Sequence, residues 1–213
     1  LGLSKNNAQH SYLTQYLQQT KFANPFRNKT RFVLNKNLTI YDFFISFTPD
    51  DGQRKHRTPV YEAFCSNRRA VAAATTHKSL SCPDGNTRYD LHNLYQSVSR
   101  YRFGISPPGV GWDCYRTYEY LALGIIPIVS KRKGVTLHQD LPIIAVEGDL
   151  SNTQHVIQTV QAYVRSPEFL QRNFDQGWNQ LFLQHWRTKL LKDAQRPTFS
   201  GTDGRTYYSA WKY

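Results

Sequence analysis

The chain has 213 residues, of which 27 are Lys or Arg and 15 are Asp or Glu, so its formal charge at pH 7 is +12. Hydrophobic residues make up 39% and aromatic residues 14%, which excludes a disordered basic tail and allows one sizeable core. No apolar run is long enough for a membrane span, and residues 1–20 are too polar for a cleavable leader. The excess of positive charge predicts an anionic partner: nucleic acid, a phosphorylated ligand, an acidic glycan or a membrane surface.

The N-terminal segment has a helical pattern followed by a loop. Residues 8–20 space Tyr12, Leu13, Tyr16 and Leu17 on one helical face. The polar, basic stretch 24–37 predicts a loop with a short strand at 31–34. We therefore expect residues 1–40 to form a helical arm or linker.

From residue 41 onward, short apolar runs alternate with segments of helical periodicity. The expected strands are 41–48, 70–75, 101–106, 125–130 and 143–146. The expected helices are 58–66 (with Thr58 as N-cap and Pro59 in the first turn), 91–98, 115–123 and 156–164. This alternation predicts βαβ units with a parallel sheet, and hence an α/β, doubly wound domain over 41–165.

The C-terminal part, 166–213, is expected to pack on that domain. Residues 168–191 have the spacing of one long helix, and 195–213 form an aromatic, turn-rich tail.

Two loops should lie where ligands bind in open parallel sheets, at the carboxyl ends of strands. The first, 48–58, joins a strand to a helix and carries Arg54, Lys55 and Arg57. A phosphate there would meet both a helix start and an Arg fork, although a solvated basic loop explains the residues equally well.

The second loop is richer in candidate ligand groups. Gly109 and Gly111 allow close approach of a ligand to the backbone, and Asp113 is placed to cap the next helix. Arg116 lies in the first turn of that helix, and Glu119 shares its face, where a carboxylate suits a vicinal diol such as a ribose.

This second region resembles the exostosin-like glycosyltransferases. Their C-terminal domains carry a Ser-Pro-x-Gly loop, an Arg-x-x-Glu-Ala-Leu helix, a Gly-x-(Ile/Val)-Pro-(Ile/Val) strand and a later Leu-Pro turn. The matching residues here are Ser106, Pro107, Gly109, Arg116, Glu119, Leu121, Gly124, Pro127 and Leu141-Pro142. The sequence Asp113-Cys114-x-Arg116-Thr117 is most similar to a xylosyltransferase-type branch of the family. Two residues depart from the pattern: Tyr120 stands where Ala is usual, and Pro108 stands where some members have Arg.

The resemblance implies the C-terminal, Rossmann-like, nucleotide-sugar-binding half of a GT-B glycosyltransferase. Residues 1–40 would then be a remnant of the N-terminal acceptor domain, or that domain lies outside the chain. The implied reaction transfers xylose or another UDP-linked sugar to a glycan or glycoconjugate acceptor. The residues implied to bind the donor are Arg57, Ser106, Gly109, Gly111, Asp113, Arg116, Thr117 and Glu119.

The same resemblance implies a metal-independent reaction with no cofactor besides the nucleotide-sugar substrate. Asp-x-Asp is absent, and Glu147-Gly148-Asp149 predicts a turn rather than a metal site. The catalytic base stays unassigned among Asp50, Asp51 and His56. A Golgi or secretory location is expected for a eukaryotic protein and a cytoplasmic one otherwise, with any membrane anchor outside this chain.

Two alternatives remain open at this point. One is a non-catalytic Rossmann-like module that binds an anionic glycan; the other is a nucleic-acid binder, which the dispersed positions of the basic residues disfavour. Cys65 and Cys82 can form a disulfide in an oxidising compartment, and packing or pairing of Cys114 is favoured over reactivity.

Overall fold

The computed structural model describes residues 7–33, 37–47, 49, 56–74, 82, 91–109, 114–131, 140–182, 198–200 and 206–208. The helices are α1 (Asn7–Gln19), α2 (Arg57–Ala74), α3 (Leu91–Val98), α4 (Tyr115–Ala122), α5 (Thr153–Arg165), α6 (Pro167–Gln171) and α7 (Asp175–Gln180). The strands are β1 (Phe43–Ile45), β2 (Phe103–Ile105), β3 (Ile126–Ser130), β4 (Ile144–Val146), β5 (Thr198–Ser200) and β6 (Thr206–Tyr208).

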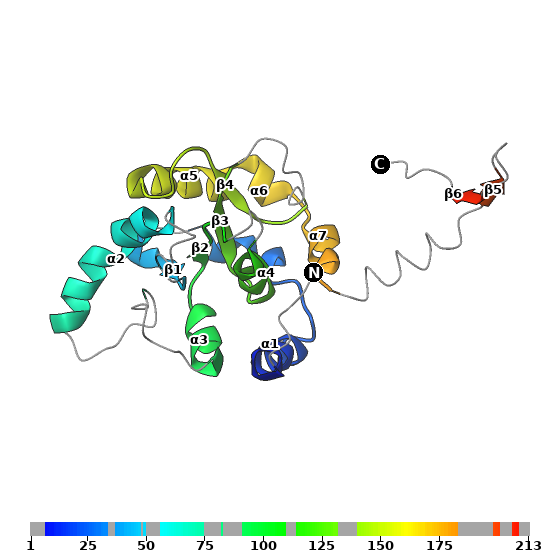
Figure 1. The fold of residues 1–213 in the computed structure, drawn as a ribbon. Helices are drawn as coiled ribbons and strands as arrows, with labels where there is room; N and C mark the ends of the chain where they lie inside the picture. Colours follow the sequence, from blue (N-terminus) through cyan, green and yellow to red (C-terminus); the bar gives the residue numbers. More distant parts are fainter. Residues whose placement is uncertain are drawn as a thin grey trace.

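The centre of the molecule is a four-stranded sheet in the order β1-β2-β3-β4, and every neighbouring pair is parallel. Helices flank this sheet, with α2 beside β1, and with α5 and α6 near β4 (Figure 1). The four strands are short apolar runs in which most residues are buried, as expected for a sheet covered on both faces. The expectation of a Rossmann-like α/β fold with a parallel sheet is confirmed.

The first strand is shorter than the sequence predicts. Residues Ile40–Asp42 form a 3-10 turn, and the ladder with β2 begins at the pair Phe43 and Phe103. The carboxylate of Asp42 accepts hydrogen bonds from the backbone and hydroxyl of Thr39, at 2.8 and 2.9 Å, which holds the turn closed. This local capping takes Tyr41 and Asp42 out of the strand.

The strand expected at 70–75 is wrong, because α2 continues to Ala74. Alanine has the highest helix propensity, so the Ala-rich end of the segment extends a helix already formed. The helix also begins one residue before the expected N-cap, which places Thr58 and Pro59 in its first turn.

Among the helices in the described part of the chain, none is both long and apolar enough to cross a membrane.

The N-terminal segment belongs to the same core as the sheet. The expected helix is confirmed as α1, which packs against α3 and buries Leu13 and Leu17. The short strand expected at 31–34 is wrong within the described residues: two 3-10 turns, Pro25–Arg27 and Lys29–Arg31, occupy this stretch, and the second one includes Arg31. These turns allow the rings of Phe26 and Phe32 to stack inside the core at 5.8 Å between centroids.

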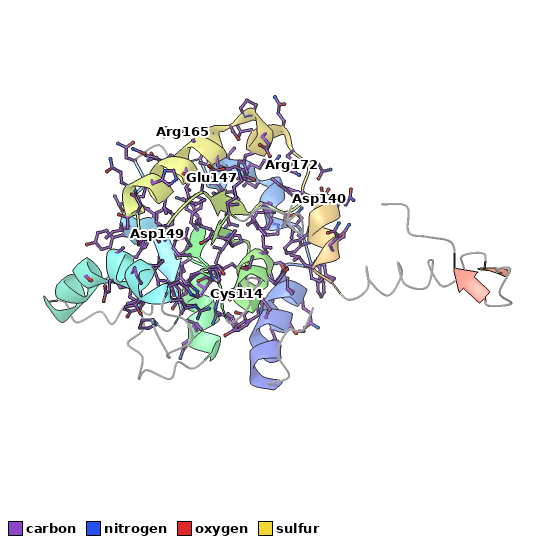
Figure 2. The ribbon with its side chains drawn as sticks, turned by 45° about the horizontal axis from the view of Figure 1, so that its top comes forward. Cys114, Asp140, Glu147, Asp149, Arg165 and Arg172 are labelled. Carbon is purple, nitrogen blue, oxygen red and sulfur yellow. A yellow bond between two sulfur atoms is a disulfide. The ribbon has the colours of Figure 1, made fainter. Side chains whose placement is uncertain are left out.

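The long helix expected at 168–191 is also wrong within the described residues. It is broken between α6 and α7, where Arg172 has an extended backbone and the Asn173 side chain accepts a hydrogen bond from the Asp175 backbone at 2.8 Å. The break brings Arg172 to Asp140, at 3.8 Å (Figure 2). Apolar spacing alone missed this break, because Asn173 offers the backbone a local alternative to helical bonding.

Strands β5 and β6 in the tail form an antiparallel pair. They lie apart from the sheet and its helices in Figure 1. The packing of residues 195–213 on the domain remains a prediction.

Candidate functional site

The candidate site lies where β1 and β2 end and where α2 and α4 begin. Because the two strands are parallel, both carboxyl ends lie at one edge of the sheet. The described part of the loop after β2 is 106–109, and α4 begins at Tyr115 with Cys114 as its N-cap. The fold thus brings the segment around Arg57 to the Ser-Pro-x-Gly loop, although about fifty residues separate them in sequence.

A buried ion pair anchors the start of α4. The Arg116 guanidinium donates from Nη1 to Oε2 of Glu119 at 2.5 Å. The other carboxylate oxygen, Oε1, accepts a 2.6 Å hydrogen bond from the hydroxyl of Tyr95 on α3. Side-chain exposure is 14% for Arg116 and 5% for Glu119, so of this pair the guanidinium retains more access to solvent.

Burial and charge act together on this cluster. Burial, and then the negative charge of Glu119, raise the pKa of Tyr95 above its usual value. Burial is the largest single effect on the pKa of Arg116 and lowers it, but attraction by Glu119 together with that of Tyr120, Tyr115 and Tyr95 outweighs burial, so the pKa is raised. At neutral pH the cluster therefore contains a neutral phenol and a charged guanidinium.

Arg57 lies at the first position of α2 and points to the loop after β2. Its Nε donates to the carbonyl oxygen of Pro108 at 2.7 Å, and His56 Nε2 lies 2.9 Å from the same oxygen. The guanidinium of Arg57 also lies over the ring of Phe47, 5.7 Å from the centroid. Arg57 thus helps to fix the shape of the loop, which is a role that the sequence does not reveal.

Ser106 and Thr117 join the end of β2 to the first turn of α4. Their hydroxyls are hydrogen bonded at 2.9 Å, and the residues are each only 2% exposed. The backbone N–H of Ser106 also donates to Ile128 on β3. These contacts orient α4 relative to the sheet and, through it, Arg116.

The remaining expected site residues are placed as follows. Gly109 is half-buried and is the last residue described in the loop before Cys114. Gly111 and Asp113 lie outside the described residues, as do Asp50, Asp51, Arg54 and Lys55. The expected cap by Asp113 therefore has no structural description, and α4 has Cys114 in that position.

Glu119 faces the protein rather than an open surface. Both of its oxygens are bonded, and the residue is 4% exposed. Its expected contact with a ribose remains a prediction. Tyr95 was missed as a site residue because its place on an apolar helical face predicts only packing; the signal that could have found it is that a buried phenol needs a hydrogen-bond partner.

A disulfide fixes the neighbouring edge of the sheet. Cys65 on α2 is bonded to Cys82, with 5.5 Å between their Cα atoms, and Cys114 is free and buried. The backbone N–H of Cys82 donates to Ile45 at the end of β1. The disulfide thus ties α2, which carries Arg57, to the strand beside it.

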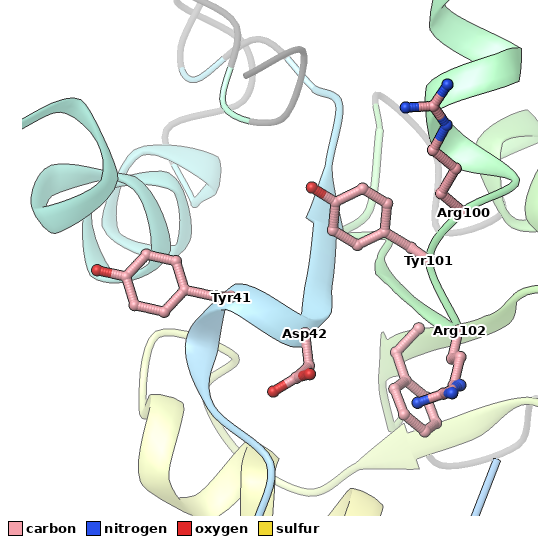
Figure 3. A pocket seen from close by; sticks show the side chains of 6 residues that line it. Tyr41, Asp42, Arg100, Tyr101 and Arg102 are labelled. Atoms are coloured by element: carbon pink, nitrogen blue, oxygen red, sulfur yellow. The ribbon is translucent and has the colours of Figure 1, made fainter. Parts of the chain in front are cut away.

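A separate cavity of about 410 Å³ lies at the opposite edge of the sheet. Figure 3 shows Tyr41 and Asp42 from the turn before β1, and Arg100, Tyr101 and Arg102 from the turn before β2. Because these turns precede parallel strands, this cavity is at the amino ends, away from Arg116.

Chemically, the cluster at the carboxyl ends offers a fixed guanidinium beside a helix N-terminus, which suits an oxyanion such as a phosphate. Among the described residues, no three His, Cys, Asp or Glu side chains gather as a metal site would need.

Comparison of the chain with models of known protein families found no match, and comparison with curated proteins also found none.

Proposed function

We propose that this protein is a glycosyltransferase that uses a nucleotide-sugar donor and transfers the sugar to a glycan or glycoconjugate acceptor. The observation that carries the proposal is the buried Tyr95–Glu119–Arg116 cluster beside the Ser-Pro-x-Gly loop. The resemblance of residues 103–146 to exostosin-like enzymes supports the same reading. In this proposal the chain is the donor-binding half of a GT-B enzyme.

Arg116 and the first turn of α4 hold the donor diphosphate. As the bond to the sugar breaks, the leaving diphosphate gains negative charge that the guanidinium and the backbone N–H groups stabilise. Because Glu119 and the Ser106–Thr117 contact fix this geometry before the donor binds, little reorganisation is needed during the reaction. Arg57 supplies a second cation and holds the loop through Pro108.

The acceptor hydroxyl must lose a proton, which requires a base. We do not assign this base: His56 is bonded to Pro108, and Glu119 is bonded to Arg116 and Tyr95. The other candidates, Asp50 and Asp51, lie outside the described residues. The alternative is a Rossmann-like module that binds an anionic glycan without turnover. Release of nucleoside diphosphate from a bound nucleotide sugar, measured with and without a glycan acceptor, distinguishes the two.

The Cys65–Cys82 disulfide supports an oxidising compartment, such as the secretory lumen. The proposed location is therefore the Golgi or another secretory compartment, where many glycans are built.

A thermal-shift screen over nucleotide sugars tests the donor site directly. A donor present at a hundred times its Kd should add about 2.7 kcal/mol to the free energy of unfolding and raise Tm by roughly 5–10 °C. Arg116→Ala should abolish this increase. Arg100→Ala, at the opposite edge of the sheet, is the matched control and should keep it.

If no nucleotide sugar raises Tm and none releases nucleoside diphosphate, the proposed function is wrong. If the increase survives in Arg116→Ala but is lost in another variant, the donor lies elsewhere on the protein.

A further inference from the structure

Tyr95 differs from the other members of its cluster because it comes from a separate helix. Arg116 and Glu119 are both on α4, after β2, whereas Tyr95 is on α3, before β2. The hydroxyl of Tyr95 reaches across to Glu119 with a 2.6 Å hydrogen bond. This bond is therefore a tertiary contact that joins two helices at the candidate site.

The burial of the three side chains decreases toward Arg116. Tyr95 is 1% exposed, Glu119 is 4% exposed, and the Arg116 side chain is 14% exposed. A ligand that enters this site can thus reach the guanidinium, while the phenol stays enclosed by protein. The hydrogen bond to Glu119 therefore offers Tyr95 an indirect route to a ligand on the guanidinium.

The carboxylate of Glu119 has one partner on each oxygen, which fixes the rotation of the group. Without the Tyr95 hydroxyl, Oε1 would be a buried acceptor that lacks its bond, a state that costs about 1–3 kcal/mol. The carboxylate relieves this cost by turning both oxygens toward Arg116. That rotation would move the guanidinium from its position and neutralise more of its charge.

We propose that Tyr95 is a positioning residue that, through Glu119, aims the Arg116 guanidinium at the diphosphate of the donor. This inference rests on the proposed function, since it requires a diphosphate ligand. It adds a residue outside the loop and helix that resemble the glycosyltransferase pattern. Tyr95 touches neither the donor nor the reacting atoms.

The test uses Tyr95→Phe, which removes the hydroxyl and keeps the ring in the core. Binding of UDP, inorganic pyrophosphate and uridine is measured by titration calorimetry with the full chain. We expect Tyr95→Phe to weaken UDP and pyrophosphate about fivefold to tenfold, which corresponds to about 1–1.4 kcal/mol, and to leave uridine unchanged. Equal weakening of all three probes would indicate a loosened core and overturn the proposal.

Two controls complete the design. Tyr163→Phe, on α5, removes the hydroxyl of a partly buried tyrosine and should change none of the three affinities. In an Arg116→Ala background, Tyr95→Phe should have no further effect on pyrophosphate, because the group on which it acts is absent. A full additional loss in that background contradicts action through Arg116.

The two proposals fail in different ways. If wild-type protein binds none of the diphosphate probes, both the donor site and the role of Tyr95 are wrong. If Arg116→Ala weakens UDP and pyrophosphate but Tyr95→Phe does not, the donor site stands and only the positioning role is wrong.

Discussion

The ring of Tyr120 occupies the space that a side chain at position 104 would need. A Cβ atom added to Gly104 would lie 2.5 Å from Cε2 of Tyr120 and 2.7 Å from Cδ2. Gly104 is in the middle of β2, and Tyr120 on α4 is fully buried against that strand. The ring of Tyr120 therefore fits against β2 because Gly104 has no side chain.

This relationship predicts strong coupling between the two positions. Gly104→Ala should destabilise the protein by about 1–3 kcal/mol through overpacking, and Tyr120→Ala by about 3–5 kcal/mol through cavity formation. The double variant should lose at least ~1 kcal/mol less unfolding free energy than the two single variants lose together. Removing the ring takes away the clash, and the added methyl group fills part of the cavity. Urea unfolding of the four proteins measures this cycle.

Tyr163→Ala provides the control cycle with Gly104→Ala. Tyr163 packs on Phe169 near the other edge of the sheet, so the two effects should add. Additivity in the Tyr120 cycle as well would show that the close contact has no energetic meaning.

Gly177 in α7 is predicted to tolerate no side chain. An added Cβ would lie 1.8 Å from the backbone oxygen of Asp140, and backbone cannot rotate away as a side chain can. Gly177→Ala should therefore lower the free energy of unfolding by about 3 kcal/mol despite the higher helix propensity of Ala. Thermal unfolding of the variant measures this cost. Gln176→Ala, at the exposed neighbouring position, is the control and should be neutral or slightly stabilising.

The two ion pairs formed by Glu119 and Glu147 should differ sharply in importance. Glu119→Gln leaves the largely buried Arg116 without its counter-charge, which should cost about 3 kcal/mol and lower Tm by roughly 6–12 °C. Glu147→Gln breaks the exposed contact with Lys131 and should change Tm little. Similar effects of the two variants on Tm would contradict the buried role of Glu119.

Alkaline pH should destabilise the protein through its buried phenols. Burial raises the pKa of Tyr120 to about 12, from an ordinary value near 10. The unfolded state therefore loses this proton first, so stability is complete below pH 10 and is lost as the pH rises toward 12. Tyr120 alone accounts for a loss of roughly 2 kcal/mol over this range.

Urea unfolding at pH 8 to 11.5 measures this loss, using the wild type and Tyr120→Phe. The variant should show a shallower decline above pH 10, because it cannot release the proton. Parallel declines in the two proteins would exclude Tyr120 as the source.

The three cysteines make a prediction that needs no variant. Cys65 and Cys82 are bonded, and Cys114 is free but buried. A thiol reagent should therefore detect one thiol per chain in denaturant without reductant, and little in the native protein. Reduction should lower the free energy of unfolding by about 3 kcal/mol, as expected for a loop closed over 17 residues. Three thiols in unreduced, denatured protein would disprove the disulfide.

The elements that the sequence predicted best are those with strong local signals. The helix at 115–122 and the strand at 126–130 were expected within one or two residues, because apolar periodicity and β-branched runs agree there. The strand expected at 70–75 and the long helix at 168–191 failed where local patterns conflict: an Ala-rich segment extends α2, and Asn173 interrupts the second pattern.

The sequence by itself determined the α/β class and the positions of Arg57, Arg116 and Glu119 near the ends of strands, because alternating apolar periods and loop composition are local properties. Only the tertiary structure decided that Arg57 holds Pro108, that Tyr120 lies on Gly104, and that Tyr95 reaches Glu119. These contacts join residues on separate elements, and a hydrogen bond depends on distances of a few tenths of an ångström that no spacing along the chain encodes. The net charge of +12 follows from the sequence alone. The folded structure shows that one of these positive charges, on Arg116, is paired with the buried carboxylate of Glu119.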